Sequence, residues 1–156
     1  MRNTFKIGTV FEFRTFNGDF FYGQLTHRHR LMGDLIRFRK IRFIERQPQP
    51  ELLFQQEAVE TQYAPCFSSI KVLTRTHDAT MVATCAVPSN LADLPYFRGG
   101  VIAPEIGLYQ KPSIWDGESF HPLEKYPAIN TSLLPELASI PIQDIRELAE
   151  LFPKFN

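Results

Sequence analysis

The chain has 156 residues, of which 44% are hydrophobic, 13% aromatic and 22% charged, and its formal net charge is zero. This length supports one domain with a core that needs no disulfide or metal, and the aromatic content excludes a disordered chain. Zero net charge removes the main compositional argument for binding nucleic acid or an anionic membrane, and no apolar run has the length of a membrane span. We expect a single cytoplasmic domain over residues 1–156.

Charge is unevenly distributed along the chain. Residues 1–50 hold 10 basic and 4 acidic residues, a balance of +6, which leaves 7 and 13 for residues 51–156, a balance of −6. This asymmetry has two interpretations: two oppositely charged faces of one domain, or charges that interleave after folding.

The first predicted element is a β-hairpin within residues 6–26. Two apolar runs, Thr9–Phe16 and Phe20–Leu25, flank Asn17-Gly18, the dipeptide that best tolerates a two-residue type I′ turn. With this turn centre Phe13 pairs with Tyr22. The expected core face then contains six residues, Phe11, Phe13, Thr15, Phe20, Tyr22 and Gln24, because the opposite face would bury Glu12 without a partner.

Glycine positions in the hairpin suggest a curled sheet. Gly8 precedes the first strand and Gly23 interrupts the second, where an isolated glycine marks a bulge or a close approach. The fold class predicted is therefore mainly β: a small SH3-like barrel or a strongly bent antiparallel sheet, with a C-terminal α-helix.

The next predicted strand, Leu35–Ile44, is basic. Arg37, Arg39, Lys40 and Arg42 are interleaved with aromatic residues, a pattern that suits nucleic acid because bases stack on aromatic rings while cations follow phosphates. The alternative is a strand with a basic outer face and an apolar inner face, which the zero net charge favours.

Further elements are predicted in chain order. Leu52–Val59 fits either a short strand or one to two helical turns. Two strands, Ser69–Leu73 and Ala79–Val87, are separated by a turn at 76–78. Residues 88–130 are rich in loops, with at best a short strand in 101–109 and a second hairpin at 113–120 whose turn centre is Asp116-Gly117.

The C-terminal part is expected to be helical. A short helix begins in Leu133–Leu137, and a longer one covers residues 141–152 between two prolines. Its apolar face is defined by residues recurring every three to four positions: Ile142, Ile145, Leu148, Ala149 and Phe152.

No catalytic, cofactor or metal site is predicted. His27 and His29 alternate as metal ligands on a strand do, but no third ligand is nearby in sequence, so a solvated basic loop is the simpler interpretation. The two cysteines, Cys66 and Cys85, lack metal-ligand spacing, and neither a nucleophile motif nor a phosphate-binding loop occurs.

The hairpin resembles a known family. The matching residues are Lys6, Ile7, Gly8, Val10, Phe11 and Phe13 in the first strand and Phe20, Tyr22, Gly23, Gln24 and Leu25 in the second. With a looser match in Gly107–Leu123, this pattern resembles the immunity protein 26 family of bacterial polymorphic toxin systems. The resemblance implies a mostly β protein without enzymatic activity, which neutralises a toxin made by the same cell.

We therefore expect the partner to be a cognate protein toxin. The acidic balance of residues 51–156 suggests a basic toxin such as a nuclease, since opposite potentials speed encounter. Trp115 and Tyr109 are the predicted aromatic anchors, and the acids Glu105, Asp116 and Glu118 are the predicted rim.

Two other functions fit the sequence. One is an SH3- or Tudor-like module that binds nucleic acid or a peptide through the aromatic residues and the basic strand. The other is a small enzyme whose site is assembled from distant residues, with His27, His29, His77 and His121 as its acid/base groups.

Overall fold

The computed structural model describes residues 5–30, 33–55, 61–66, 70–99, 102–103, 108–109, 113–115, 120–122, 125, 127–128, 136–137, 149 and 152–155. These residues form a mainly β structure. Its strands are β1 (Thr9–Arg14), β2 (Phe20–His29), β3 (Gly33–Arg39), β4 (Arg42–Phe43), β5 (Thr61–Pro65), β6 (Ala79–Thr84), β7 (Phe97–Gly99), β8 (Ile102–Ala103), β9 (Leu108–Tyr109), β10 (Ser113–Trp115), β11 (Phe120–Pro122), β12 (Glu136–Leu137) and β13 (Lys154–Phe155). Its helical elements are η1 (Pro50–Phe54), α1 (Lys71–Arg75) and η2 (Ser89–Leu91).

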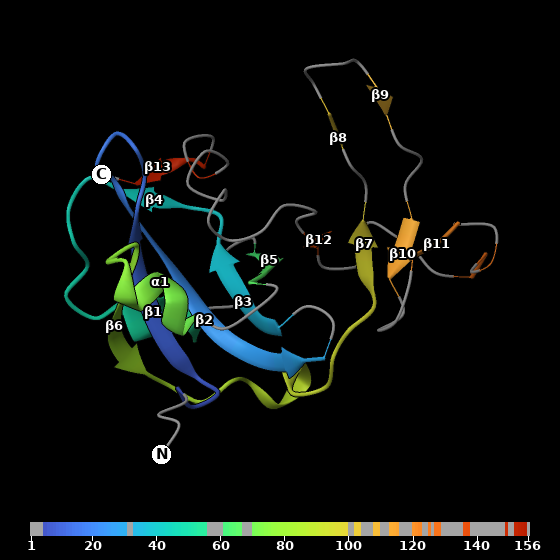
Figure 1. The fold of residues 1–156 in the computed structure, drawn as a ribbon, viewed down its shortest axis with the longest axis horizontal. Coiled ribbons are helices and arrows are strands. Elements are labelled where there is room, and N and C mark those ends of the chain that lie inside the picture. Colours follow the sequence, from blue (N-terminus) through green and yellow to red (C-terminus); the bar gives the residue numbers. More distant parts are fainter. Residues whose placement is uncertain are drawn as a thin grey trace.

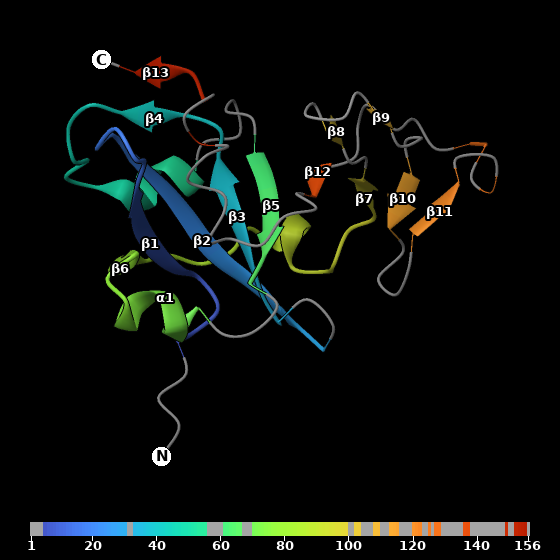
Figure 2. The same ribbon diagram turned by 45° about the horizontal axis from the view of Figure 1, so that its top comes forward.

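Eleven of the described strands join in one sheet. Their order is β11-β10-β7-β12-β5-β3-β2-β1-β6, with β4 paired to β2 and β13 paired to β4. Most neighbours are antiparallel, but β12 runs parallel to β5 and β7, and β13 runs parallel to β4. Figures 1 and 2 show β6 and the β10–β11 pair at opposite ends of the molecule.

Across the described strands the sheet stays open, with β6 and β11 at its two ends. Of the two forms expected from the sequence, a small barrel or an antiparallel sheet, the closed barrel is therefore wrong, and the described residues form an open, mostly antiparallel sheet. The reason lies in the later chain, because β7, β10, β11 and β12 extend the sheet beyond β5 rather than returning to β6.

The predicted N-terminal hairpin forms, but its register differs by one residue. Phe13 pairs with Phe21, not Tyr22, and Arg14 pairs with Phe20. The loop is longer than predicted: the Thr15 N–H donates to the Asp19 carbonyl at 2.8 Å. Gly18 has φ +89°, while Asn17 is not among the described residues with positive φ, so the connection is a three-residue loop that ends in a left-handed glycine.

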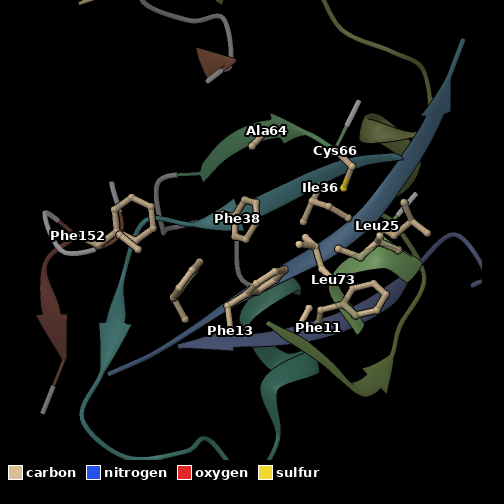
Figure 3. Packing of buried hydrophobic residues seen from close by; sticks show 13 residues of the cluster. Phe11, Phe13, Leu25, Ile36, Phe38, Ala64, Cys66, Leu73 and Phe152 are labelled. Atoms are coloured by element: carbon tan, nitrogen blue, oxygen red, sulfur yellow. The ribbon is translucent and has the colours of Figure 1, made fainter. Parts of the chain in front are cut away.

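This register changes the core face on β2. The main core cluster contains Phe11 and Phe13, as predicted, but their partners are Phe21 and Leu25 instead of Phe20 and Tyr22. Figure 3 shows the packing of this cluster, with Leu73 of α1 beside Phe11 and Leu25. The cluster as a whole comprises Phe11, Phe13, Phe21, Leu25, Ile36, Phe38, Ala64, Cys66, Ile70, Leu73, Ala79, Ala149 and Phe152.

Gly23 allows this packing. A Cβ atom at Gly23 would lie 2.5 Å from a methyl group of Ile36 and 2.9 Å from the ring of Phe38. The atoms close to this glycine belong to side chains of β3, which occupy the space above the Gly23 backbone, and not to another strand's backbone as predicted.

The opposite face of the sheet is also buried. Val10, Phe20, Tyr22, Phe43 and Phe54 form a second cluster, which brings η1 and β4 onto this face. Both faces of β1 and β2 are therefore covered, which explains why residues 9–13 and 20–26 of these strands are all buried.

Elements between residues 50 and 87 match the sequence in part. The ambiguous segment after Pro50 begins as the 3-10 helix η1, and β6 confirms the strand predicted in 79–87, including the turn before it. The strand predicted at Ser69–Leu73 is wrong, because residues 71–75 form α1. Ile70 and Leu73 are buried in the main cluster, and this packing decides the conformation.

The loop-rich segment contains only short strands among its described residues. The second hairpin is confirmed: β10 pairs with β11, with Trp115 opposite Phe120, while its predicted turn centre lies outside the described residues. The helix start predicted at Leu133–Leu137 is wrong where it is described, since 136–137 form β12.

Two residues of the predicted C-terminal helix are described. Ala149 is helical but Phe152 lies in a bend, so the described residues do not show the predicted helix. Both side chains are buried in the main cluster. The other positions of 141–152 lie outside the described residues. After Pro153 the chain forms β13, which the sequence did not predict.

Candidate functional site

Two of the predicted toxin-binding residues, Trp115 and Tyr109, lie on short strands that the structure describes. Trp115 ends β10 and Tyr109 ends β9, and β10 and β9 belong to different sheets. The side chains of these two residues, and all of Glu105, Asp116 and Glu118, lie outside the described residues. This predicted surface therefore stays a prediction.

The basic strand is not a solvent-facing stripe. Arg37 and Arg39 are 4% and 3% exposed, beneath η1, and their guanidinium groups lie 5.5 and 5.8 Å from the ring of Phe54. Arg37 donates to the Gln24 side chain at 2.8 Å, and Arg39 donates to the Leu53 carbonyl. The prediction of a basic outer face is thus wrong, because η1 covers it.

Arg42 forms hydrogen bonds that link residues 152–153 to the N-terminal hairpin. Its guanidinium donates to the Asp19 carboxylate and to the Phe152 carbonyl, both at 2.9 Å, and its backbone N–H donates to the Pro153 carbonyl. Arg37, Arg39 and Arg42, all predicted for the nucleic-acid stripe, are therefore used inside the fold.

Glu12 occupies the buried face that the sequence analysis rejected for it. Its carboxylate accepts from Arg46 Nε at 3.0 and 3.1 Å and from the Tyr22 hydroxyl at 3.1 Å. The Gln47 N–H in turn donates to that hydroxyl at 2.8 Å. Burial, followed by the nearby carboxylate, raises the pKa of Tyr22 to about 12, so the phenol stays protonated.

A second group of polar side chains lies beside Glu12 and Tyr22 on the same face of the sheet. Gln24, Arg37 and Tyr63 are aligned across β2, β3 and β5. Arg37 Nε and the Tyr63 hydroxyl are buried without a hydrogen-bond partner. Burial lowers the pKa of Arg37 and that of Arg39, the latter to about 10, which still leaves Arg39 charged at neutral pH.

The histidines do not gather in one place. His27 and His29 lie on β2, His77 lies in the turn between α1 and β6, and His121 lies on β11 at the other end of the sheet. His27 Nε2 donates to the Ala92 carbonyl at 3.0 Å, and burial lowers its pKa. Within the described residues no group of three or more His, Cys, Asp or Glu is placed to hold a metal ion.

The cysteines behave as small packed side chains. Cys66 is buried in the main cluster, and burial raises the pKa of its thiol to about 12. Cys85 is half-buried, accepts from the Gln24 amide at 3.2 Å, and has its pKa raised by burial. A raised pKa lowers the thiolate fraction, which makes both thiols poor nucleophiles.

The described structure offers one clear candidate for binding, which we name the β6 edge surface: Ile7, Leu52, Val72, Met81 and Val82. These side chains are 37% to 51% exposed. Met81 and Val82 belong to β6. Val72 lies on α1 and Leu52 on η1, which flank β6 on opposite faces of the sheet. Ile7 precedes Gly8, whose carbonyl accepts from the Cys85 N–H. Exposed aliphatic side chains grouped in this way are typical of interaction sites.

Sequence reasoning did not find this surface. The run 79–87 has no charged residue, and the sequence predicts it only as a strand, without indicating whether it is buried. The same composition on an edge strand produces an exposed apolar surface, and which strand lies at an edge depends on the whole topology.

Comparisons of this chain with models of protein families, with curated proteins and with solved structures find no match. Among the described residues no helix is long and apolar enough to cross a membrane.

Proposed function

We propose that this chain is a cytoplasmic immunity protein, which binds and neutralises a cognate bacterial toxin through surface complementarity. The observation that carries the proposal is the hairpin pattern that resembles the immunity protein 26 family. The residues of this pattern have structural roles in the fold. Val10, Phe11 and Tyr22 are fully buried, Gly8 has φ +99°, and side chains of β3 pack against Gly23. Such a pattern specifies a shared hairpin, and function then resides in the surface that the hairpin supports.

The β6 edge surface supports binding as the mode of action. Immunity by binding needs a desolvated apolar centre, and the described part of the chain exposes apolar side chains on β6 and on the two elements that flank it. The toxin class favoured by the acidic balance of residues 51–156 is a basic protein such as a nuclease.

Co-expression tests the proposal. The product of the adjacent upstream gene should arrest growth when expressed alone and leave growth normal when this chain is co-expressed. A product that is harmless alone, or equally toxic with this chain present, would contradict the immunity role.

A peptide-binding module is the second candidate, and the same β6 edge surface favours it. The nucleic-acid form of this alternative has less support, because Arg37 and Arg39 are buried. Binding to RNA or DNA that weakens steeply with salt would be the result expected of a nucleic-acid module.

A further inference from the structure

We infer that the toxin adds an extended strand to the outer side of β6. This inference rests on the proposed function and specifies how the partner docks. The backbone supplies the first argument: among the described strands β6 pairs only with β1, so the other side of β6 carries N–H and C=O groups that no described strand bonds. Strand addition to such an edge is a recurrent way of recognising extended segments.

The composition of the edge supplies the second argument. Proteins commonly protect edge strands with lysine or proline. The other end strand, β11, contains Pro122, and β13 contains Lys154 directly after Pro153. β6 has neither residue type, and no charge occurs from Ala79 to Val87. Of the end strands of the main sheet that the structure describes, β6 is therefore the one without such protection, and exposed apolar side chains border it.

Local geometry presents two apolar side chains at this edge. The pairing of β6 with β1 is irregular between Val10 and Phe11, whose partners are Ala83 and Met81, so Val82 is an extra residue of a bulge. Met81 and Val82 are 51% and 37% exposed. A docked strand would cover both, with Val72 of α1 and Leu52 of η1 on elements that flank β6.

Charge at the two ends of β6 indicates the occupant. Arg14 and Arg75 are exposed near the Ala79 end, and Lys6 is exposed near the Thr84 end. The acids at these ends, Asp78 and Glu51, are only half-exposed. The complementary ligand is an extended protein segment that is uncharged over about the six residues of β6 and acidic at its ends.

The same charges disfavour a second copy of this chain. Antiparallel pairing of two β6 strands would bring the Thr84 end of one copy to the Ala79 end of the other, and so Lys6 towards Arg14 and Arg75. Like charges placed together across an interface weaken it, whereas an acidic segment is attracted.

The test uses the full chain and the toxin identified by co-expression, in a catalytically inactive form. Amide hydrogen exchange should slow in peptides covering 79–85 when the toxin is bound, because strand addition protects outward-facing N–H groups. Met81→Lys and Val82→Lys should each weaken binding by about tenfold or more, as expected for residues at an interface centre. Ile44→Lys is the matched control, since Ile44 is also 51% exposed and lies outside the β6 edge surface; it should change Kd less than about twofold.

The outcomes separate the two proposals. A wild-type complex with unchanged exchange over 79–85 and unaltered affinity for the two β6 variants would overturn strand addition and leave the immunity role standing. Absence of any complex would overturn both. Free protein that dimerises through β6, and becomes monomeric with Met81→Lys, would assign the edge to a second copy and also overturn the inference.

Discussion

Tyr22 shows how single residues make a buried carboxylate acceptable on the sheet. The Tyr22 hydroxyl donates to Glu12 and accepts from the Gln47 N–H, while Arg46 supplies the opposite charge. The sequence argument that Glu12 could not be buried unpaired was physically sound, but its partner lies 34 residues away and is not visible in the local pattern. Long-range pairing of this kind is what sequence reasoning misses at the residue scale.

The hydroxyl groups of the two buried tyrosines, Tyr22 and Tyr63, should contribute differently to the free energy of unfolding. Tyr22→Phe removes two hydrogen bonds and should lower the free energy of unfolding by about 1–3 kcal/mol, because Glu12 and the Gln47 N–H lose a partner. Tyr63→Phe removes a hydroxyl without a hydrogen-bond partner and should leave stability within about 0.5 kcal/mol or raise it. Urea denaturation of both variants measures this, and equal losses would show that the Tyr63 hydroxyl is bonded.

Stability should fall in alkaline solution from about pH 9 upwards. Burial raises the pKa of the Cys66 thiol from 9.0 to about 12 and that of Tyr22 from 10.0 to about 12. The unfolded chain therefore releases protons first, so the stabilisation is complete below pH 9 and is lost as pH rises towards 12.

Cys66→Ala isolates the contribution of the thiol. The variant should have a shallower decline of unfolding free energy between pH 9 and 11, by up to about 1.4 kcal/mol per pH unit for one proton. The slope against pH is the readout, since the smaller side chain also lowers stability at every pH. Parallel slopes for the two proteins would mean that Cys66 is not protonated in the folded state over that range.

At the scale of elements, the hairpin shows which structural features a local sequence pattern can predict. Alternating aromatic residues around Asn17-Gly18 predicted two paired strands, and both formed. The loop is one residue longer than predicted, which shifts the pairing of the two strands by one residue. Because side chains alternate between the two faces of a strand, this shift places Phe21 instead of Tyr22 on the main core face. Both faces of these strands are buried, so hydrophobic alternation could not fix the register.

Gly18 offers a direct test of the loop. A Cβ atom there would meet nothing within 4 Å, so substitutions act through the φ of +89° alone. Gly18→Val should cost about 1–2 kcal/mol, while Gly18→Asn, which tolerates this conformation, should cost a few tenths. Thermal unfolding of the pair measures the difference; similar melting temperatures would place Gly18 outside the left-handed region.

Among the other elements, some were predicted correctly from local sequence and some were not. The strand at 79–87 was predicted by its composition, whereas 71–75 was predicted as a strand and forms α1. There Ile70 and Leu73 pack in the main cluster, and the Ile70 N–H donates to Asp34 on β3 at 2.8 Å. Tertiary contacts therefore outweigh the β propensity of a five-residue segment.

At the scale of the whole molecule, the mainly β class followed from composition and pattern, but the open sheet did not. A sheet closes into a barrel only if its two end strands pair with each other. Here short strands from beyond residue 96 instead extend the sheet past β5. The β6 edge surface follows from that topology, so its exposure could not be predicted from residues 79–87 alone. The basic strand failed as a candidate site for the same reason, because η1 arrives from later in the chain to cover it.

The central claim is that this chain works by binding another protein. Titration calorimetry of the purified chain with the inactive product of the adjacent upstream gene measures that claim directly. We predict a one-to-one complex with Kd below about 1 µM, as a specific protein–protein interface provides. No heat of binding and no co-elution at about 100 µM of each protein would contradict it.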